Sequence, residues 1–305
     1  MNWQLLPQFA VTGLLAGGPL ALTALGLVLI FKSTYIFNFA QGQLLLMGAL
    51  VTWWFTVELG LPLWLSILLA LLVSALLGLL IERIALRPMT GQPLLSIILM
   101  TLGLSQVLQG LALLIFGGSQ RNFPQIFRAA PYKITTPWLF QGNNIVIILK
   151  QNLVWSFVVA ILGVLVISGI FRFTRIGLAM RGASEDHELA QSIGLRIHRI
   201  FGLSWALAGV VATLGGVLLA TSSGLDLSLS VVVLAAFPVV LLGGLESIPG
   251  TIAGGLLIGL SQGLVAVSKA PLVHNTAEIM PYVVLLIVLL IRPEGLLGQR
   301  RIERI

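Results

Sequence analysis

Titratable side chains are concentrated in one stretch of this 305-residue chain, residues 171–200. This polar segment reads FRFTRIGLAMRGASEDHELAQSIGLRIHRI and combines five arginines with the acids Glu185, Asp186 and Glu188. Apolar runs long enough to cross a bilayer precede and follow it. A catalytic site needs groups that converge from different elements, whereas these follow one another along a single segment. We therefore expect the polar segment to bind another protein rather than to catalyse a reaction.

The centre of the polar segment has the pattern of a short capped helix. Ser184 stands at the N-cap position, acids follow at the positive end of the helix, and Gly194 supplies the C-cap. This pattern predicts one helix over Glu185–Ile193, with an apolar edge that includes Ala190. An interfacial helix without a partner is the alternative. However, interfacial helices favour Lys and Arg, which the anionic leaflet attracts. The three acids here would be repelled by that leaflet.

Uncharged polar side chains inside the predicted spans form a second set of candidates. The stretch YIFNFAQGQ places Asn38, Gln41 and Gln43 at or just inside the membrane. Amides are costly in lipid unless they are paired, so they either line a translocation path or hold helices together. The same two readings apply to three residues of a later span, Ser105, Gln106 and Gln109.

Other chemistry has little support in the sequence. The stretch from Gly26 to Ser33 resembles part of a phosphate-binding loop, but Phe31 occupies the position of the second glycine and would block the backbone cradle. The three histidines are too far apart to suggest a metal cluster, and the chain has no cysteine. We therefore expect no catalytic residue, no metal and no cofactor in this chain.

The composition indicates that lipid is the solvent of the fold. Hydrophobic residues make up 58% of the chain and charged residues 9%, whereas soluble domains carry about 25% charged residues. A helix needs about 20 apolar residues to cross the hydrocarbon core, so the chain has room for about eight to ten spans. We predict an all-α, polytopic integral membrane bundle that forms a single domain over residues 1–305, with some short or broken helices. The predicted spans are Phe9–Phe31, Ile36–Val57, Leu61–Ile81, Pro93–Phe116, Leu153–Phe171, Phe201–Thr221, Leu229–Leu242, Thr251–Val267 and Glu278–Ile291.

A stripe of glycines predicts close helix packing near the end of the chain. Small residues repeated at i+4 let two helices approach each other closely, within the protein or across a dimer interface. The glycines in this stripe are Gly250, Gly254, Gly255, Gly259 and Gly263.

The distribution of Lys and Arg predicts the orientation. Short cytoplasmic loops carry an excess of these residues, and this bias accounts for the net charge of +7. With Lys32 inside, residues 172–200 and the basic C-terminal tail are also inside. The long connection over residues 117–151 is then extracytoplasmic. Because Lys and Arg are absent before Lys32, we expect the first apolar run to be a retained span rather than a cleaved signal peptide.

Several motifs together resemble one known family. Glu188, Leu189, Ala190 and Gly194 resemble the core of the coupling loop of ABC importer permeases, which docks into the ATPase. The branched-chain amino acid permeases resemble the chain more widely, in RIGLAMRGASEDHELAQSIGLRIHRI and in the four further motifs NFAQGQLLLMGA, ERIALRP, LGGLESIPGTIAGG and RPEGLLG. The chain departs from many members at Gln41 and Gln43, where they carry a histidine and an acid.

The resemblance implies a permease subunit of an importer in the bacterial plasma (inner) membrane. Its expected partners are a second, related permease, two cytoplasmic ABC ATPases that hold ATP and Mg, and an extracytoplasmic solute-binding protein. The implied substrates are branched-chain or other neutral amino acids, and urea or short-chain amides are the alternative. An ATP-independent secondary transporter or channel is the rival of another class, but it would need an ionisable residue well inside a span. The residues assigned to ATPase coupling are Ser184, Glu185, Asp186, Glu188, Ala190, Gly194 and Arg181.

Overall fold

The structure is a computed structural model that describes residues 5–127, 130–136, 145–185, 187–192, 194–267 and 276–298. Within these residues, six segments are helical, long and apolar enough to cross a membrane. Two shorter apolar helical segments accompany them. The prediction of a polytopic helical membrane protein is therefore confirmed. The long segments are Leu6–Thr34 (α1), Leu63–Met89 (α3 with η3 and η4), Leu94–Phe116 (α4), Gln151–Phe173 (α5), Ile197–Ser223 (α8) and Ile248–Ala266 (α10); the shorter ones are Leu227–Gly243 (η5 and α9) and Met280–Ile291 (α12).

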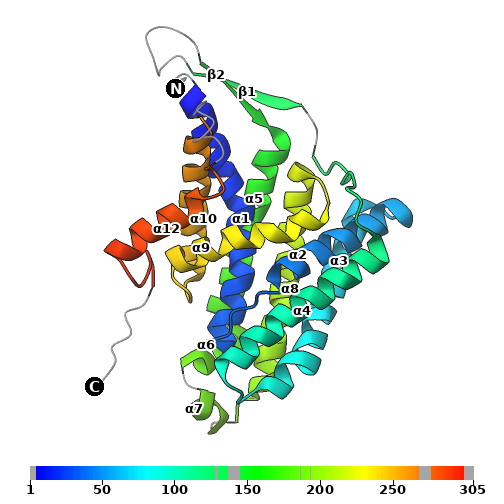
Figure 1. The fold of residues 1–305 in the computed structure, drawn as a ribbon, viewed down its shortest axis with the longest axis vertical. Coiled ribbons are helices and arrows are strands. Elements are labelled where there is room, and N and C mark those ends of the chain that lie inside the picture. Colours follow the sequence, from blue (N-terminus) through cyan, green and yellow to red (C-terminus); the bar gives the residue numbers. More distant parts are fainter. Residues whose placement is uncertain are drawn as a thin grey trace.

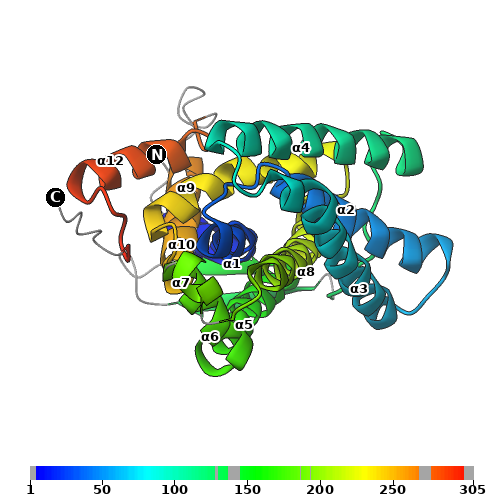
Figure 2. The same cartoon turned by 90° about the horizontal axis from the view of Figure 1, so that it is seen from below.

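The first helix, α1, lies at the centre of the bundle. Viewed along its axis, it is surrounded by α5, α8, α9 and α10, while α3, α4 and α12 lie farther out (Figure 2). Within its most apolar window, 83% of α1 is buried, compared with 22% for both α4 and α5. Pro19 lies inside α1, but the helix is not broken there. The helix α1 is therefore the scaffold on which the others pack, whereas α4 and α5 leave most of their residues outside the core of the chain.

The second predicted span begins later than the sequence pattern indicated. Residues 36–40 are not helical, and α2 covers Gln41–Trp53, followed by the π-helical turn Trp54–Glu58 (η2). The side-chain oxygen of Asn38 accepts a hydrogen bond from the Ala40 N–H at 3.0 Å. Such an Asx turn competes with the helix for backbone hydrogen bonds. The prediction that this span begins at Ile36 is therefore wrong.

The connection between α4 and α5 contains an antiparallel β-hairpin. Its strands are Pro131–Thr136 (β1) and Ile145–Lys150 (β2). The hairpin lies at the end of the molecule opposite to the helices Arg175–Glu185 (α6) and His187–Ser192 (α7) (Figure 1). The sequence pattern predicts a long connection over residues 117–151 and gives no indication of the strands.

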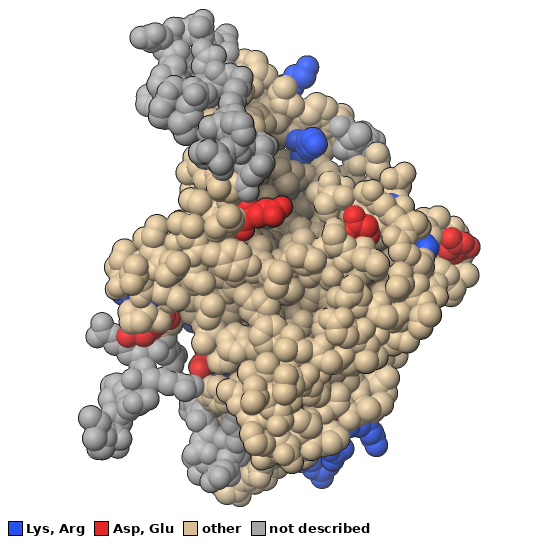
Figure 3. Space-filling view, viewed as in Figure 1, with Lys and Arg blue, Asp and Glu red and all other residues tan. Residues whose placement is uncertain are grey.

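Hydrogen bonds fix α1 to both ends of the molecule. Near its start, the Gln8 amide donates to the Ile148 carbonyl at 2.6 Å and accepts from the Ile148 N–H at 2.7 Å. Just past its end, the Tyr35 hydroxyl donates to the backbone carbonyl of Ser184 in α6. The helix α1 thus crosses the whole bundle, from the hairpin to α6. The face shown in Figure 3 has a broad belt without charged side chains between these two ends, as a membrane protein requires.

Candidate functional site

The polar segment folds as two helices, not as the single helix predicted over Glu185–Ile193. Ser184 lies near the end of α6 instead of capping a helix, and its hydroxyl donates to the Arg181 carbonyl at 2.8 Å. The prediction of Ser184 as an N-cap is therefore wrong. The helix extends farther toward the N-terminus because Arg175 to Ala183 contain no helix breaker other than glycines, and tertiary contacts hold this part in place.

The actual capping residue is Thr174. Its hydroxyl oxygen accepts a hydrogen bond from the Gly177 N–H at 3.1 Å, as an N-cap side chain does. A Cβ atom at Gly177 would lie 2.3 Å from the Phe171 carbonyl oxygen, so the sharp turn from α5 into α6 needs a glycine there. Neither residue is among those predicted from the sequence. A threonine three residues before a glycine, just after the apolar run, was the available signal.

The two helices are held against the bundle on one side and exposed on the other. In α6, Met180 is 1% exposed and Ala183 is fully buried. In α7, Ala190 is 2% exposed, while Gln191 and Ser192 are exposed. The acids Glu185, Asp186 and Glu188 carry side chains outside the described part of the structure.

Gly194 ends this helical pair in the left-handed conformation, with φ of +87°. Its N–H donates to the Gln191 carbonyl at 2.9 Å, and the Leu195 N–H donates to the Ala190 carbonyl at 3.0 Å. Such hydrogen bonds close the end of a helix. Residues with a side chain rarely adopt this backbone conformation, so the turn into α8 depends on Gly194.

A cavity of about 900 Å³ lies next to α7. It is bounded by the turn after α3, formed by Glu82–Leu86 (η3) and Arg87–Met89 (η4), and by the start of α8. Glu82 is 6% exposed, and Gly202 on α8 leaves space beside its carboxylate. Arginines predominate among the polar residues that line this cavity: Arg83, Arg87, Arg196 and Arg199, beside His198.

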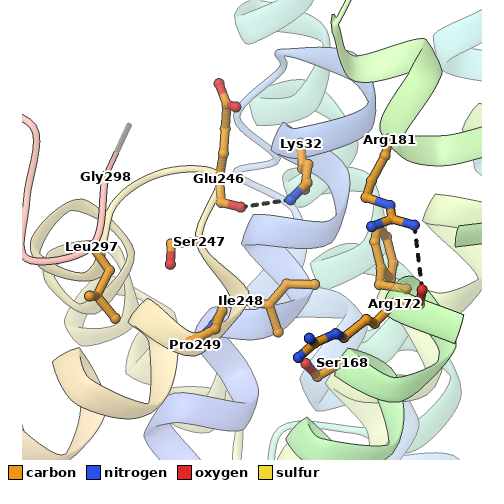
Figure 4. A pocket seen from close by; sticks show the side chains of 11 residues that line it. Lys32, Ser168, Arg172, Arg181, Glu246, Ser247, Ile248, Pro249, Leu297 and Gly298 are labelled. Atoms are coloured by element: carbon orange, nitrogen blue, oxygen red, sulfur yellow. Dashed lines mark hydrogen bonds between the residues drawn. The ribbon is translucent and has the colours of Figure 1, made fainter. Parts of the chain in front are cut away.

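Arg181 of α6 lines a different cavity of about 260 Å³ (Figure 4). Lys32 from the end of α1 and Arg172 from the end of α5 line it as well. The end of the molecule that carries α6 and α7 therefore has two cavities, each lined by basic side chains. In the sequence these bases lie in separate loops, and only the fold brings them together.

The buried amides at and just before the start of α2 bond to one another and to a neighbouring helix. Asn38 and Gln41 are fully buried, and the Asn38 amide donates to the Gln41 side-chain oxygen at 3.3 Å. The Gln41 amide in turn donates to the Ala208 carbonyl of α8 at 3.4 Å. On α1, Gly26 leaves the room that Gln41 occupies, since a Cβ atom there would lie 2.0 Å from the Gln41 amide nitrogen. Gln41 thus joins three helices.

The other predicted polar residues of the spans do not belong to this cluster. Gln43 is 6% exposed, and its side-chain oxygen is buried without a hydrogen-bond partner. On the peripheral helix α4, Gln106 is exposed, and Ser105 and Gln109 are half-buried. The structure therefore does not gather the six predicted path residues around one cavity.

The glycine stripe of α10 lies against α1 and α9. A Cβ atom at Gly259 would lie 2.4 Å from the Gly13 carbonyl oxygen, and one at Gly263 would lie 2.3 Å from the Phe9 carbonyl oxygen. Gly255 faces α1 in the same way, whereas Gly250 and Gly254 face the end of α9. These contacts are within one chain. Among the described residues, no group of three or more His, Asp or Glu side chains could hold a metal ion.

Comparison with known proteins identifies relatives of nearly the same length. Residues 9–289 match the family described as "Branched-chain amino acid transport system / permease component". The high-affinity branched-chain amino acid transport system permease protein LivH of Escherichia coli is 27% identical, over 98% of this chain and 97% of that protein. BraD of Pseudomonas aeruginosa has the same identity and coverage. A probable branched-chain amino acid transport permease protein LivH of Methanocaldococcus jannaschii is 28% identical, over 92% of this chain and 88% of the relative.

Proposed function

Because the chain belongs to the family of branched-chain amino acid permease components, we propose that it is the membrane subunit of an ATP-binding-cassette importer. The family predicted from the motifs between Asn38 and Gly298 is thereby confirmed. The observation that carries the proposal is the match along almost the whole chain, which includes the polar segment as well as the spans. ATP hydrolysis then belongs to partner subunits, and this chain moves substrate without covalent chemistry.

The end of the molecule with α6 and α7 is proposed to face the cytoplasm and to receive force from the ATPases. Its helices are short, with one side packed on the bundle and the other exposed. Movement of α6 would reach α1 through Tyr35, whose hydroxyl binds the Ser184 carbonyl. The described part of the C-terminal segment lies at the same end, because the Leu296 N–H donates to the Leu242 carbonyl near the α9–α10 turn. Rigid-body movement of packed helices is a common form of such switching.

The hairpin end is proposed to face outward and to receive the substrate from a solute-binding protein. A cavity of about 660 Å³ lies there, between the hairpin connection and the ends of α1, α5 and α8. Gln8, Lys150 and Asn152 contribute polar side chains to its lining. Branched-chain or other neutral amino acids are the proposed substrates, since LivH and BraD are permeases for branched-chain amino acids.

The amides at the start of α2 are proposed to hold helices together rather than to bind substrate. Asn38 and Gln41 are fully buried and satisfy each other and the Ala208 carbonyl. The sequence left open whether these amides line a translocation path or hold helices together, and this geometry favours helix packing.

Uptake into proteoliposomes that contain the whole complex tests the proposed function. We expect ATP-dependent accumulation of labelled leucine in the presence of the binding protein, with unlabelled leucine competing and urea failing to compete. Competition by urea alone would assign the substrate to the amide class. Uptake by this chain without ATPases or ATP would overturn the importer assignment in favour of a secondary transporter.

A matched pair of glycine substitutions tests the coupling end. Gly194→Ala strains a residue with φ of +87°, whereas Gly182→Ala adds a methyl group in α6 where no atom lies within 4 Å. We expect Gly194→Ala to lower ATP-dependent uptake and Gly182→Ala to leave it unchanged. The harsher double substitution Glu188→Lys with Gly194→Pro should abolish uptake while the protein remains in the membrane. Full uptake by the double variant would refute the assignment of this region to coupling.

A further inference from the structure

The cavity beside Arg181 collects positive charge from three different helices. Lys32 reaches it from α1, Arg172 from α5 and Arg181 from α6. In Figure 4 the ends of these side chains point toward the space between α5 and the α9–α10 turn. Like charges repel, so three cations around a cavity of about 260 Å³ are unfavourable unless an anion compensates them.

Among the described residues, Glu246 is the acid of this lining, and its side chain does not point into the cavity (Figure 4). The backbone carbonyl of Glu246 accepts a hydrogen bond from the Lys32 ammonium at 3.1 Å. Its carboxylate points away from the two arginines (Figure 4). Among the described residues of this lining, one acid, whose charge offsets part of that of Lys32, stands against three bases, so a net positive charge remains.

The arginine donors are only partly used. The Arg181 Nε atom is buried and has no hydrogen-bond partner, and the Arg181 Nη2 atom makes one long bond of 3.4 Å to the Arg172 carbonyl. The Arg172 guanidinium lies 5.5 Å from the centre of the Phe173 ring. Guanidinium groups offer five N–H donors in a fork that fits oxyanions. A buried donor without an acceptor costs free energy that a bound anion would recover.

The start of α10 adds further groups suited to an anion. Ser247 caps this helix by accepting the Gly250 N–H at 3.1 Å, so the positive end of the α10 dipole faces the cavity. Ser168 on α5 contributes a second hydroxyl to the lining. Hydroxyl groups, a helix start and two guanidinium groups are the usual partners of a phosphate.

We propose that this cavity binds a phosphate-type oxyanion. The source is either the phosphodiester headgroup of an anionic lipid in the adjacent leaflet or a free phosphate ion, since the same donors recognise both. The cavity lies where α1 and α5 end, which is the level of lipid headgroups in a helical membrane protein. The bound anion would tie α6 to α5 and to the α9–α10 turn. The inference stands apart from the proposed function, because binding requires neither an ATPase nor transport.

Binding to the purified full-length chain in neutral detergent tests the inference by native mass spectrometry and thermal shift. The probes are phosphatidylglycerol, phosphatidylcholine and inorganic phosphate. We expect phosphatidylglycerol or phosphate to bind and to raise the unfolding temperature, and phosphatidylcholine to do neither. Loss of the bound lipid on addition of phosphate assigns one shared site, whereas lipid binding that phosphate does not displace assigns the site to the headgroup.

Three arginine variants decide where the anion binds. Arg181→Gln and Arg172→Gln should each weaken binding about tenfold, the equivalent of one charge-assisted hydrogen bond. The control is Arg175→Gln, an exposed residue of α6 outside this lining, which should bind as the unmodified protein does. Arg172 is itself exposed, so its variant remains informative if Arg181→Gln fails to fold. Absence of binding, or equal binding by all three variants, would overturn the proposal.

Discussion

The interior around α1 and the end formed by α6 and α7 use polar and small residues in opposite ways. In the interior, glycines bring backbones together, and the Asn38 and Gln41 amides satisfy each other and an α8 carbonyl. At the α6 end, arginines line two cavities, and Arg181 keeps a buried donor without a partner. The Asn38 and Gln41 side chains find their partners within one chain, whereas Arg181 at the α6 end keeps a donor that something else can bind.

The difference helps to separate the polar residues of a membrane protein that stabilise the fold from those that bind a ligand or a partner. A buried amide with its hydrogen bonds made inside the chain stabilises helix packing. A cluster of cations whose hydrogen-bond donors lack acceptors is suited to bind an anion or an acidic protein surface. Substitutions in the interior should therefore lower the stability of the fold, and substitutions at the α6 end should lower binding or uptake.

The largest effect is expected from Gly259→Leu in the α1–α10 contact. A Cβ atom at position 259 would already lie 2.4 Å from the Gly13 carbonyl oxygen and 2.7 Å from the Gly17 Cα atom. The leucine side chain would therefore clash with the backbone of α1. We expect a loss beyond about 4 kcal/mol and no folded protein in detergent extracts. Gly103→Leu on α4 is the matched control, because no atom lies within 4 Å of that position. Equal yields of the two variants would contradict the close packing of α1 and α10.

A smaller but more specific effect is expected from Gly26→Ala. The added methyl group displaces the Gln41 amide, which lies 2.0 Å from the Cβ position, and breaks its bonds to Asn38 and Ala208. Leaving these buried groups unpaired should cost about 1–3 kcal/mol, measured by thermal unfolding in detergent. The double variant Gly26→Ala with Gln41→Ala should be more stable than the sum of the two single losses predicts. If the stability losses of the two single variants simply add up in the double variant, Gly26 does not serve to make room for Gln41.

Asn38→Ala should lower the stability of the fold by about 1 kcal/mol, since it removes the acceptor of the Ala40 N–H and the donor to Gln41. The control is Gln106→Ala on the exposed face of α4, which should change the unfolding free energy by less than about 0.5 kcal/mol. A larger loss for Gln106→Ala would place a protein contact on α4 that the single chain does not contain.

The smallest effect on stability is expected at the α6 end. Arg83→Gln and Arg87→Gln replace exposed residues of the larger cavity and should change the unfolding free energy by less than about 0.5 kcal/mol. If this cavity contacts the ATPase, both variants should nevertheless lose copurifying ATPase subunits as the salt concentration rises. Unchanged retention of these subunits at every salt concentration would remove this cavity from the proposed contact.

The sequence was sufficient for features that depend on local composition. Apolar runs of about 20 residues mark helices that lipid permits, and helices occur near most of the predicted spans. The stretch GGLESIPG before α10 contains glycines and a proline, which are typical of a tight turn. The polar segment was also recognisable, since no other stretch carries so many charges. Local errors arose where two local signals compete, as at Ser184, whose predicted cap gave way to Thr174.

Only the tertiary structure decided which of these residues meet. Gln41 and the Ala208 carbonyl are 167 positions apart, and the Lys32 ammonium and the Glu246 carbonyl are 214 apart. A residue's type shows that an amide in lipid needs a partner, but the partner depends on how helices pack across the bundle. By itself, the sequence determined that this is a helical membrane protein of one transport family. The fold decided that Asn38 and Gln41 bond within the interior and that several arginines line cavities, because contacts between distant helices follow from packing rather than from local composition.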